Sequence, residues 1–321
     1  MADHSGTADH SGTADQHGTT TQHGMADAGR DRVGELVLGA WDAFLAQAAA
    51  VDLTAPTRLP GWRAQEVCVH LGSWPDHTAL ADLVANARAG GTGTPDDVDA
   101  VNARVTAAHR TASRDEVLAA LARNRETTVA YLRDEPVELD TAPTVSTVGR
   151  LPLLSVVLGQ AYELAVHGLD LVTAGAAPPP APVLQAGLAA LADVTGALAA
   201  GEHLTAGATL ATPDGGWAFA AGGGGWTVRQ VPAGPVRGTA VEAPADLLLD
   251  AASGRANQVT ALARRKLTVH ELGGLLRLAP IVSTAPGIPG GPILALAART
   301  LGGAGGPVSY THLTLPTILR V

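Results

Sequence analysis

The apolar positions in the first half of the chain recur at intervals of three and four residues, as in helices that bury one face. Pro75 falls inside the second such stretch and is expected to kink or split its helix. Ser113 with Glu116 three residues later has the form of a capping box at a helix start. Four main helices with longish connections predict a four-helix bundle. The expected helices, the third of them short, cover residues 31–51, 63–88, 97–108, 113–133 and 153–174.

The hydrophobic pattern changes after the proline-rich segment 178–182. Short runs rich in apolar residues, bounded by glycine, proline and aspartate, then follow one another, as in strands joined by turns. The predicted fold class is therefore α plus α+β, a four-helix bundle followed by a smaller α+β domain. In the second domain we expect strands at residues 208–212, 217–220, 226–230, 238–242 and 266–269, and helices at 183–200, 245–253 and 272–278.

The two ends of the chain differ in composition from its middle. Residues 1–24 carry a degrading polar repeat with four histidines, and such a segment cannot bury a core and is expected to be disordered. Met25 is an alternative start, and residues 308–313 look like a translated sequencing adapter, so we exclude that end from functional reasoning. The expected division is a tail at 1–29, the bundle at 30–175, the α+β domain at 176–286 and a Gly/Pro-rich tail at 287–321.

Composition narrows the classes of function that the chain can serve. The formal net charge is −9 without a basic cluster, which argues against a nucleic-acid surface. Cys68 is the single cysteine, so an internal disulfide framework is excluded, as expected in a reducing cytoplasm. No uninterrupted apolar run reaches the roughly 18–20 residues of a membrane span. We therefore expect a cytoplasmic protein that is not embedded in a membrane.

The candidate chemistry begins with Glu163 and His167, which are four residues apart in an apolar helical stretch. Positions i and i+4 lie on the same helix face, so the two side chains point toward one place. His70 shares an apolar helical stripe with its neighbours, and a buried imidazole needs a partner. Three such ligands would leave a fourth position open, as in catalytic zinc sites. The simpler interpretation, a polar face with one satisfied histidine, remains open on spacing alone.

Several other residues are candidates for this site. Asp170 is near the same helix face as His167 and would either orient that ligand or be solvated. His77 follows His70 by seven residues, but Pro75 disturbs the helical register between them. The remaining candidates are given structural roles: Cys68, Trp62 and Trp74 are expected to pack as core residues, and His109, His203 and His270 to lie on the surface without partners.

Three motifs together resemble a known family. They are the loop Leu59-Pro60-Gly61-Trp62, the helical Val69-His70-Leu71, and the run from Glu163 through His167 to Asp170 and Leu171. In this order they are similar to the mycothiol-dependent maleylpyruvate isomerase family, whose first domain is a DinB-like four-helix metalloenzyme fold. Carried over by position, the resemblance makes His70, Glu163 and His167 the metal ligands.

The second half resembles the C-terminal domain of that family, which is similar to sterol carrier protein 2. The matching features are residues 245–249, Gly254 with Arg255, and residues 266–269 before an apolar helix. By this resemblance Arg255 would bind an anionic substrate or the thiol cosubstrate. An arginine just after a helix end is otherwise a solvated residue or a partner of carbonyl groups.

The family resemblance implies a divalent metal, zinc by preference, with mycothiol as the thiol cosubstrate. A metal-bound thiolate would add to a small electrophilic substrate, giving cis–trans isomerisation or S-transfer, and the resemblance favours the isomerase. The composition, very rich in alanine and glycine, fits an actinobacterial source, and we expect a monomer without nucleic-acid or membrane partners. The alternative is a non-enzymatic metal-binding bundle whose C-terminal domain binds a lipid or a protein partner.

Overall fold

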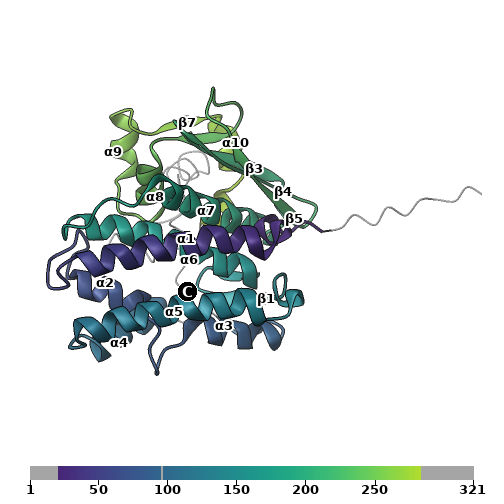
Figure 1. Cartoon of the computed structure of the whole chain (residues 1–321). Helices are drawn as coiled ribbons and strands as arrows, with labels where there is room; N and C mark the ends of the chain where they lie inside the picture. The colour runs from purple at the N-terminus through teal and green to yellow at the C-terminus, as the bar shows by residue number, and fades with distance from the viewer. Residues whose placement is uncertain (1–20, 95–96, 283–321) are drawn as a thin grey trace, which may run out of the picture.

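The computed structural model describes residues 21–94 and 97–282, in which a helical first part is followed by a part containing a mixed sheet (Figure 1). The α-helices are α1 Gly29–Ala50, α2 Ala64–Leu71, α3 Ala79–Arg88, α4 Val98–Ala108, α5 Arg114–Asp134, α6 Leu153–Val172, α7 Ala181–Gly201, α8 Ala245–Ala252, α9 Gln258–Ala263, α10 Leu272–Leu276 and α11 Ala279–Val282. The 3-10 helices are η1 Gly24–Ala28 and η2 Val137–Leu139. The strands are β1 Pro143–Ser146, β2 Gly149–Pro152, β3 Ala206–Thr212, β4 Gly215–Gly222, β5 Gly225–Val231, β6 Ala240–Glu242 and β7 Thr268–His270.

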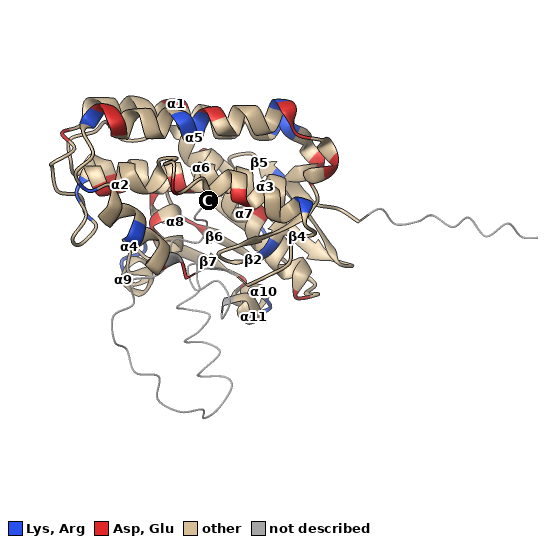
Figure 2. Ribbon diagram, turned by 90° about the horizontal axis from the view of Figure 1, so that it is seen from below, with Lys and Arg blue, Asp and Glu red and all other residues tan. Residues whose placement is uncertain are grey.

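Helix α6 lies at the centre of the helical part. All of its residues except Leu169 and Val172 are buried, because α1, α2, α3 and α7 surround it. A helix that is apolar on every side is typical of a protein core. The motif that carries Glu163 and His167 therefore lies inside the molecule. Acidic and basic residues are mixed along α1 and α5 (Figure 2).

The sheet has the strand order β5-β4-β3-β6-β7 and is antiparallel except between β3 and β6. Helix α7 packs against β4 and β5 on one side and against α6 on the other, so it is shared between the helical part and the sheet (Figure 1). Buried apolar residues form one continuous core across both parts. This arrangement confirms the predicted order of a helical part followed by an α+β part.

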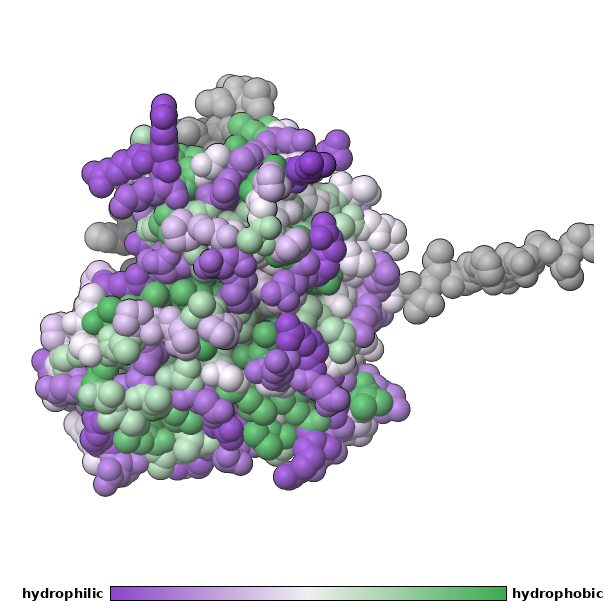
Figure 3. Space-filling view, turned by 45° about the horizontal axis from the view of Figure 1, so that its top comes forward, coloured by the Kyte–Doolittle hydropathy of each residue, from purple (hydrophilic) through white to green (hydrophobic). Residues whose placement is uncertain are grey.

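Helix α7 meets the length and hydropathy of a membrane span, although Gln185 and Asp193 interrupt its apolar run. The helix has 21 residues, and an 18-residue window within it has a mean hydropathy of 1.5. Of that window, 89% is buried inside the structure. The core helix of a folded domain has the same composition. On the face shown in Figure 3, polar and apolar side chains are interspersed, and the large exposed apolar residues Val137, Val259 and Leu272 lie on separate elements.

The segment expected to form a disordered tail up to residue 29 is structured from Thr21 onward. The main-chain carbonyl of Gln22 accepts a 3.1 Å bond from the main-chain N–H of Trp226, at the edge of β5. Met25 is buried, and its N–H donates to the buried carboxylate of Asp193 on α7 at 2.8 Å. The boundary at residue 29 was therefore too late, because a polar pattern does not reveal such main-chain contacts. Residues 1–20 and the predicted tail at 287–321 lie outside the described residues.

Other sequence predictions differ from the structure in their details. The second predicted helix is divided into α2 and α3, with Pro75 in the intervening turn, and the capping box of Ser113 and Glu116 begins α5 as expected. The hairpin of β1 and β2 and the short helix α9 were not predicted. Both consist of six or fewer residues per element, which is too short for a hydrophobic period to be recognised.

Candidate metal centre

Helices α2 and α6 bring the three predicted ligands together. Nε2 of His167 lies 3.5 Å from Oε2 of Glu163, and Nε2 of His70 lies 4.0 Å from the same oxygen. One ligand atom from each residue can be chosen so that all three lie within 4.8 Å of one another, and all three residues are buried. Among the described residues, no other set of three histidine, cysteine or carboxylate side chains lies this close together.

The outer nitrogens of both imidazoles are held by hydrogen bonds. Nδ1 of His70 lies 3.0 Å from Oδ1 of Asn102, and Nδ1 of His167 lies 2.8 Å from Oδ2 of Asp170. With the proton on Nδ1, where both oxygens can accept it, Nε2 of each ring would keep a lone pair for a metal ion in the space beside Glu163.

This donor set fits a divalent metal ion. Nε2 of His167 is buried and makes no hydrogen bond among the described residues, which is costly unless another group uses its lone pair. Two neutral imidazoles and a carboxylate match the ligands that zinc takes in catalytic sites, where a further position stays open. Burial by itself raises the pKa of Glu163, but hydrogen bonding and charge at the side chains of His167 and His70 outweigh it, so the pKa lies below its ordinary value. Glu163 is therefore an anion that can balance a cation.

Asp170 is hydrogen-bonded to His167 and lies outside the group of three converging side chains. Its side chain is fully buried, and besides His167 it accepts bonds from Nε of Arg58 at 2.7 Å and from Nε and Nη2 of Arg255 at 2.8 and 2.7 Å. Burial raises the pKa of Asp170, but the bonds and charges of His167 and Arg255 outweigh it, so the pKa lies well below its ordinary value. A carboxylate that holds the far nitrogen of a ligating histidine fixes the ring's orientation and tautomer.

Arg255 was predicted to bind an anionic substrate or the thiol, and the structure engages it with Asp170 instead. Its side chain is only 9% exposed, and two of its guanidinium nitrogens face that carboxylate. A neighbouring arginine, Arg58, joins Asp170 to Asp250 of α8, with bonds of 2.6 and 2.7 Å to the second carboxylate. Arg58 and Asn102 were both missed from the sequence. For Arg58, its position directly before the Leu59-Pro60-Gly61-Trp62 motif was the feature of the sequence that could have indicated a role in the site.

Trp62 borders the site, although it was expected to be a core residue. Its ring is nearly parallel to that of His167, at 6.3 Å and 4°, and meets His70 edge to face at 5.6 Å. Trp74 is buried as expected, and His109 stacks on it at 3.9 Å.

Two of the histidines assigned to the surface have partners. His109 lies 2.9 Å from a carboxylate oxygen of Asp76, and His270 lies 2.8 Å from one of Glu242. Cys68 is buried, and burial raises the pKa of its thiol to about 12. A thiol with that pKa is protonated at neutral pH and is not a nucleophile.

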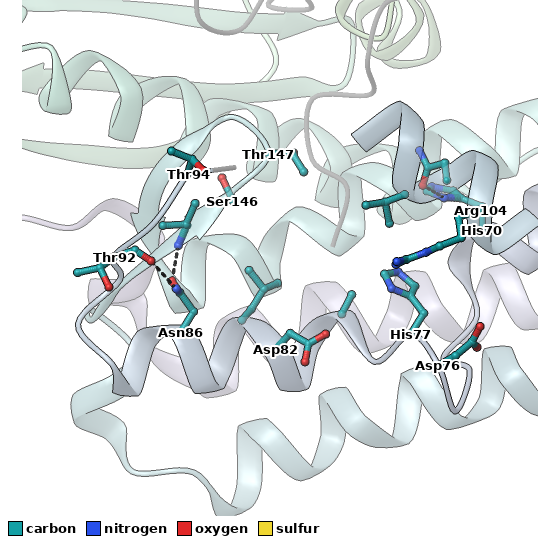
Figure 4. A pocket seen from close by; sticks show the side chains of 15 residues that line it. His70, Asp76, His77, Asp82, Asn86, Thr92, Thr94, Arg104, Ser146 and Thr147 are labelled. Carbon is teal, nitrogen blue, oxygen red and sulfur yellow. Dashed lines mark hydrogen bonds between the residues drawn. The ribbon is translucent and has the colours of Figure 1, made fainter. Parts of the chain in front are cut away.

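A cavity of about 350 Å³ opens beside His70 and Asn102. Figure 4 shows the imidazole of His77 next to that of His70, with Asp82, Asn86 and Thr92 farther along the cavity. All of the labelled side chains carry hydroxyl, amide, imidazole or charged groups, and Ala79, Leu83, Val101 and Val145 add apolar surface, so the cavity suits a polar ligand that also has apolar parts. Its polar lining consists of His70, Asp76, His77, Asp82, Asn86, Thr92, Thr94, Asn102, Arg104, Ser146 and Thr147.

Comparison with known proteins gives one family match and two similar structures. Residues 34–172 match the family described as mycothiol maleylpyruvate isomerase N-terminal domain. Crystal structures of the mycothiol-dependent maleylpyruvate isomerase and of a histidine-to-alanine mutant of it are similar, with TM-scores of 0.47 and 0.46. Each is 18% identical and covers 78% of this chain and 96% of its own. Likenesses of this degree are too weak to assign a function.

A comparison with curated proteins gives no match. The family match ends at residue 172, so the resemblance of the second half to sterol carrier protein 2 stays a prediction. Within the matched range lie both helices that carry the three converging side chains. The helical part of this chain, residues 34–172, belongs to the family of mycothiol maleylpyruvate isomerase N-terminal domains.

Proposed function

We propose that the protein is a metal-dependent enzyme that uses mycothiol to act on a small electrophilic substrate, as the name of its family suggests. The observation that carries the proposal is the convergence of His70, Glu163 and His167 in a buried site beside a polar cavity. We propose these three residues as the metal ligands and Zn²⁺ as the metal, because two imidazoles and a carboxylate are typical of catalytic zinc.

A metal ion held there would supply a positive centre that lowers the pKa of a bound thiol, so that thiolate forms at neutral pH. The chain's own residues prepare the site for this. Asn102 and Asp170 hold the protons on the outer nitrogens of the two imidazoles, and Glu163 supplies negative charge. The cavity beside His70 gives the reactants a polar route to the ligands.

The reaction that we favour is cis–trans isomerisation. The thiolate sulfur adds to one carbon of a cis double bond that is conjugated to a carbonyl group, and the electron pair moves onto that carbonyl oxygen. The former double bond, now single, rotates, and expulsion of the thiolate restores the double bond in the trans form. The thiol is regenerated, so no oxidant or reductant is required. If the sulfur stays attached and a proton is taken up, the same addition becomes S-transfer.

We further propose a cytoplasmic location and a monomer, as expected from the sequence. We propose that Arg255 contacts the thiol or substrate directly only in a state in which it no longer donates to Asp170. In the structure described here, that guanidinium contributes to the orientation of His167 through the carboxylate.

The test is mycothiol-dependent turnover of maleylpyruvate by the wild type and by His70→Ala, each loaded with Zn²⁺. The proposal expects turnover in the wild type and a large loss in His70→Ala. His270→Ala is the matched control, because His270 pairs with Glu242 on the sheet and lies outside the cavity. Equal turnover by all three proteins, or none by the wild type, would contradict the proposal.

A further inference from the structure

The loop between α1 and α2 is braced by its own hydrogen bonds. Thr57 donates to the carbonyl of Trp62 through its N–H at 3.2 Å and through its hydroxyl at 2.8 Å. The N–H of Trp62 donates to the carbonyl of Leu59, and that of Ala64 to the carbonyl of Ala55. Arg58 therefore projects from a segment with a defined conformation, not from a freely moving turn.

Arg58 contacts two carboxylates on different helices. Its Nε donates to Oδ1 of Asp170 on α6 at 2.7 Å, while Nη1 and Nη2 donate to the two oxygens of Asp250 on α8 at 2.6 and 2.7 Å. Together with Arg255, these residues form a cluster of two guanidinium and two carboxylate groups with no net charge. The cluster touches the proposed metal ligands through the bond between Asp170 and His167.

The same loop also carries Trp62, whose ring is stacked on the imidazole of His167. Two contacts from one braced segment thus converge on this histidine, directly through the Trp62 ring and indirectly through Arg58 and Asp170. A histidine ligand binds its metal well only when the ring is held in the productive orientation, and the groups behind the ligand supply that orientation.

We propose that Arg58 is a positioning residue for the metal centre. It fixes the Asp170 carboxylate that orients His167, and it fastens the Trp62 loop to α6. The inference rests on the proposed function, since it assumes a metal at His70, Glu163 and His167. It gives the loop a role in the site, while the bond to Asp250 anchors the same arginine to the part of the chain that carries the sheet.

The experiment compares Arg58→Met with Arg30→Met. Arg30 is a matched control, because it is also a partly buried arginine bound to a buried carboxylate, Asp140, with a shortest bond of 2.7 Å. Arg30 does not line the cavity or contact a proposed ligand. Both substitutions remove a buried ion pair and should lower thermal stability, but only Arg58→Met removes a contact that reaches His167.

Zn²⁺ affinity is measured by competition with a chelator on the full chain, and the visible spectrum is recorded with Co²⁺ as the bound ion. We expect Arg58→Met to weaken Zn²⁺ binding by about 10-fold and to change the Co²⁺ bands. This is the lower end of the loss for direct partners of ligating histidines, because Arg58 acts on His167 through Asp170. Arg30→Met should retain the wild-type affinity and bands. If either methionine variant does not fold, Arg58→Lys and Arg30→Lys keep the charge and allow the same comparison, with the loss again confined to position 58.

Unchanged Zn²⁺ affinity and Co²⁺ bands in the position 58 variants, or equal losses at positions 30 and 58, would overturn the inference. Either result would show that Arg58 serves stability alone. A wild type that binds neither Zn²⁺ nor Co²⁺ at the three ligands would instead overturn the proposed function, so the two failures are distinguishable.

Discussion

Replacing Asp170 by asparagine tests whether the buried cluster stabilises the fold around the site. The carboxylate accepts four bonds of 2.7–2.8 Å, two at each oxygen, from His167, Arg58 and Arg255. An asparagine of the same shape has one oxygen and one NH2 group, so two of the four donors would face another donor. Two guanidinium groups would also lose the charge that compensates them.

The magnitude follows from burial. Removing one partner of a buried ion pair costs about 3–5 kcal/mol, because the remaining charge is left uncompensated. Asp134→Asn is the control, since Asp134 accepts two bonds of 2.7 Å from Arg133, but both side chains are more than half exposed. Solvent screens that pair, so its loss should not change stability measurably.

The assay is urea unfolding of the metal-free proteins at neutral pH, followed by circular dichroism. Asp170→Asn should shift the midpoint strongly to lower urea, with an unchanged slope, and Asp134→Asn should leave both unchanged. If Asp170→Asn unfolds at the same urea concentration as the wild type, the buried cluster does not stabilise the fold in the way that its geometry indicates.

Further predictions concern the core and its titratable groups. Gly196→Ala would place a Cβ 2.5 Å from the Trp226 ring, whereas Gly39→Ala meets no atom within 4 Å, so chemical denaturation should show the first to be less stable by about 1–3 kcal/mol. Cys68, with a pKa of about 12, should resist alkylation in the folded protein at pH 8 and react after unfolding, as mass spectrometry would show. Burial raises the pKa of Asp193 above 3.8, so its favourable contribution is present at low pH and lost as pH rises through the raised value. Asp193→Asn keeps an oxygen for the N–H donors of Met25 and Trp226, which in the wild type both bond to the same carboxylate oxygen. In urea titrations from about pH 4 to 7, the stability of Asp193→Asn relative to the wild type should therefore rise with pH.

The main helices and three of the site residues were predictable from the sequence for a physical reason. A helix that buries one face repeats its apolar positions at a fixed interval, so α1 and α5 were recognisable before their packing was known. The helix α6 was recognisable as a long, mostly apolar run. Glu163 and His167 share a helix face by spacing, and His70 was indicated by its place in an apolar helical stripe. The resemblance to a family then joined the three as ligands. The structure brings these three side chains together, and their role as metal ligands remains a proposal.

The residues that support the site were not predictable in the same way. Arg58 lies 112 positions from Asp170 and 192 from Asp250, and no local pattern marks a pairing over such separations. Asn102 lies on the short helix α4, and nothing in the local sequence marks it as the residue whose side chain reaches His70. Trp62 was expected in the core, and a sequence does not indicate which rings a tryptophan side chain will meet.

The central claim is that His70, Glu163 and His167 bind a divalent metal ion. The most direct measurement is elemental analysis of the full chain after incubation with Zn²⁺ and removal of unbound metal, compared with the triple variant His70→Ala, Glu163→Gln, His167→Ala. Both proteins retain the histidines of residues 1–24, so metal bound by that segment cancels in the comparison. We predict that the wild type carries about one more Zn²⁺ per chain than the variant, whereas equal metal content in the two proteins would contradict the claim.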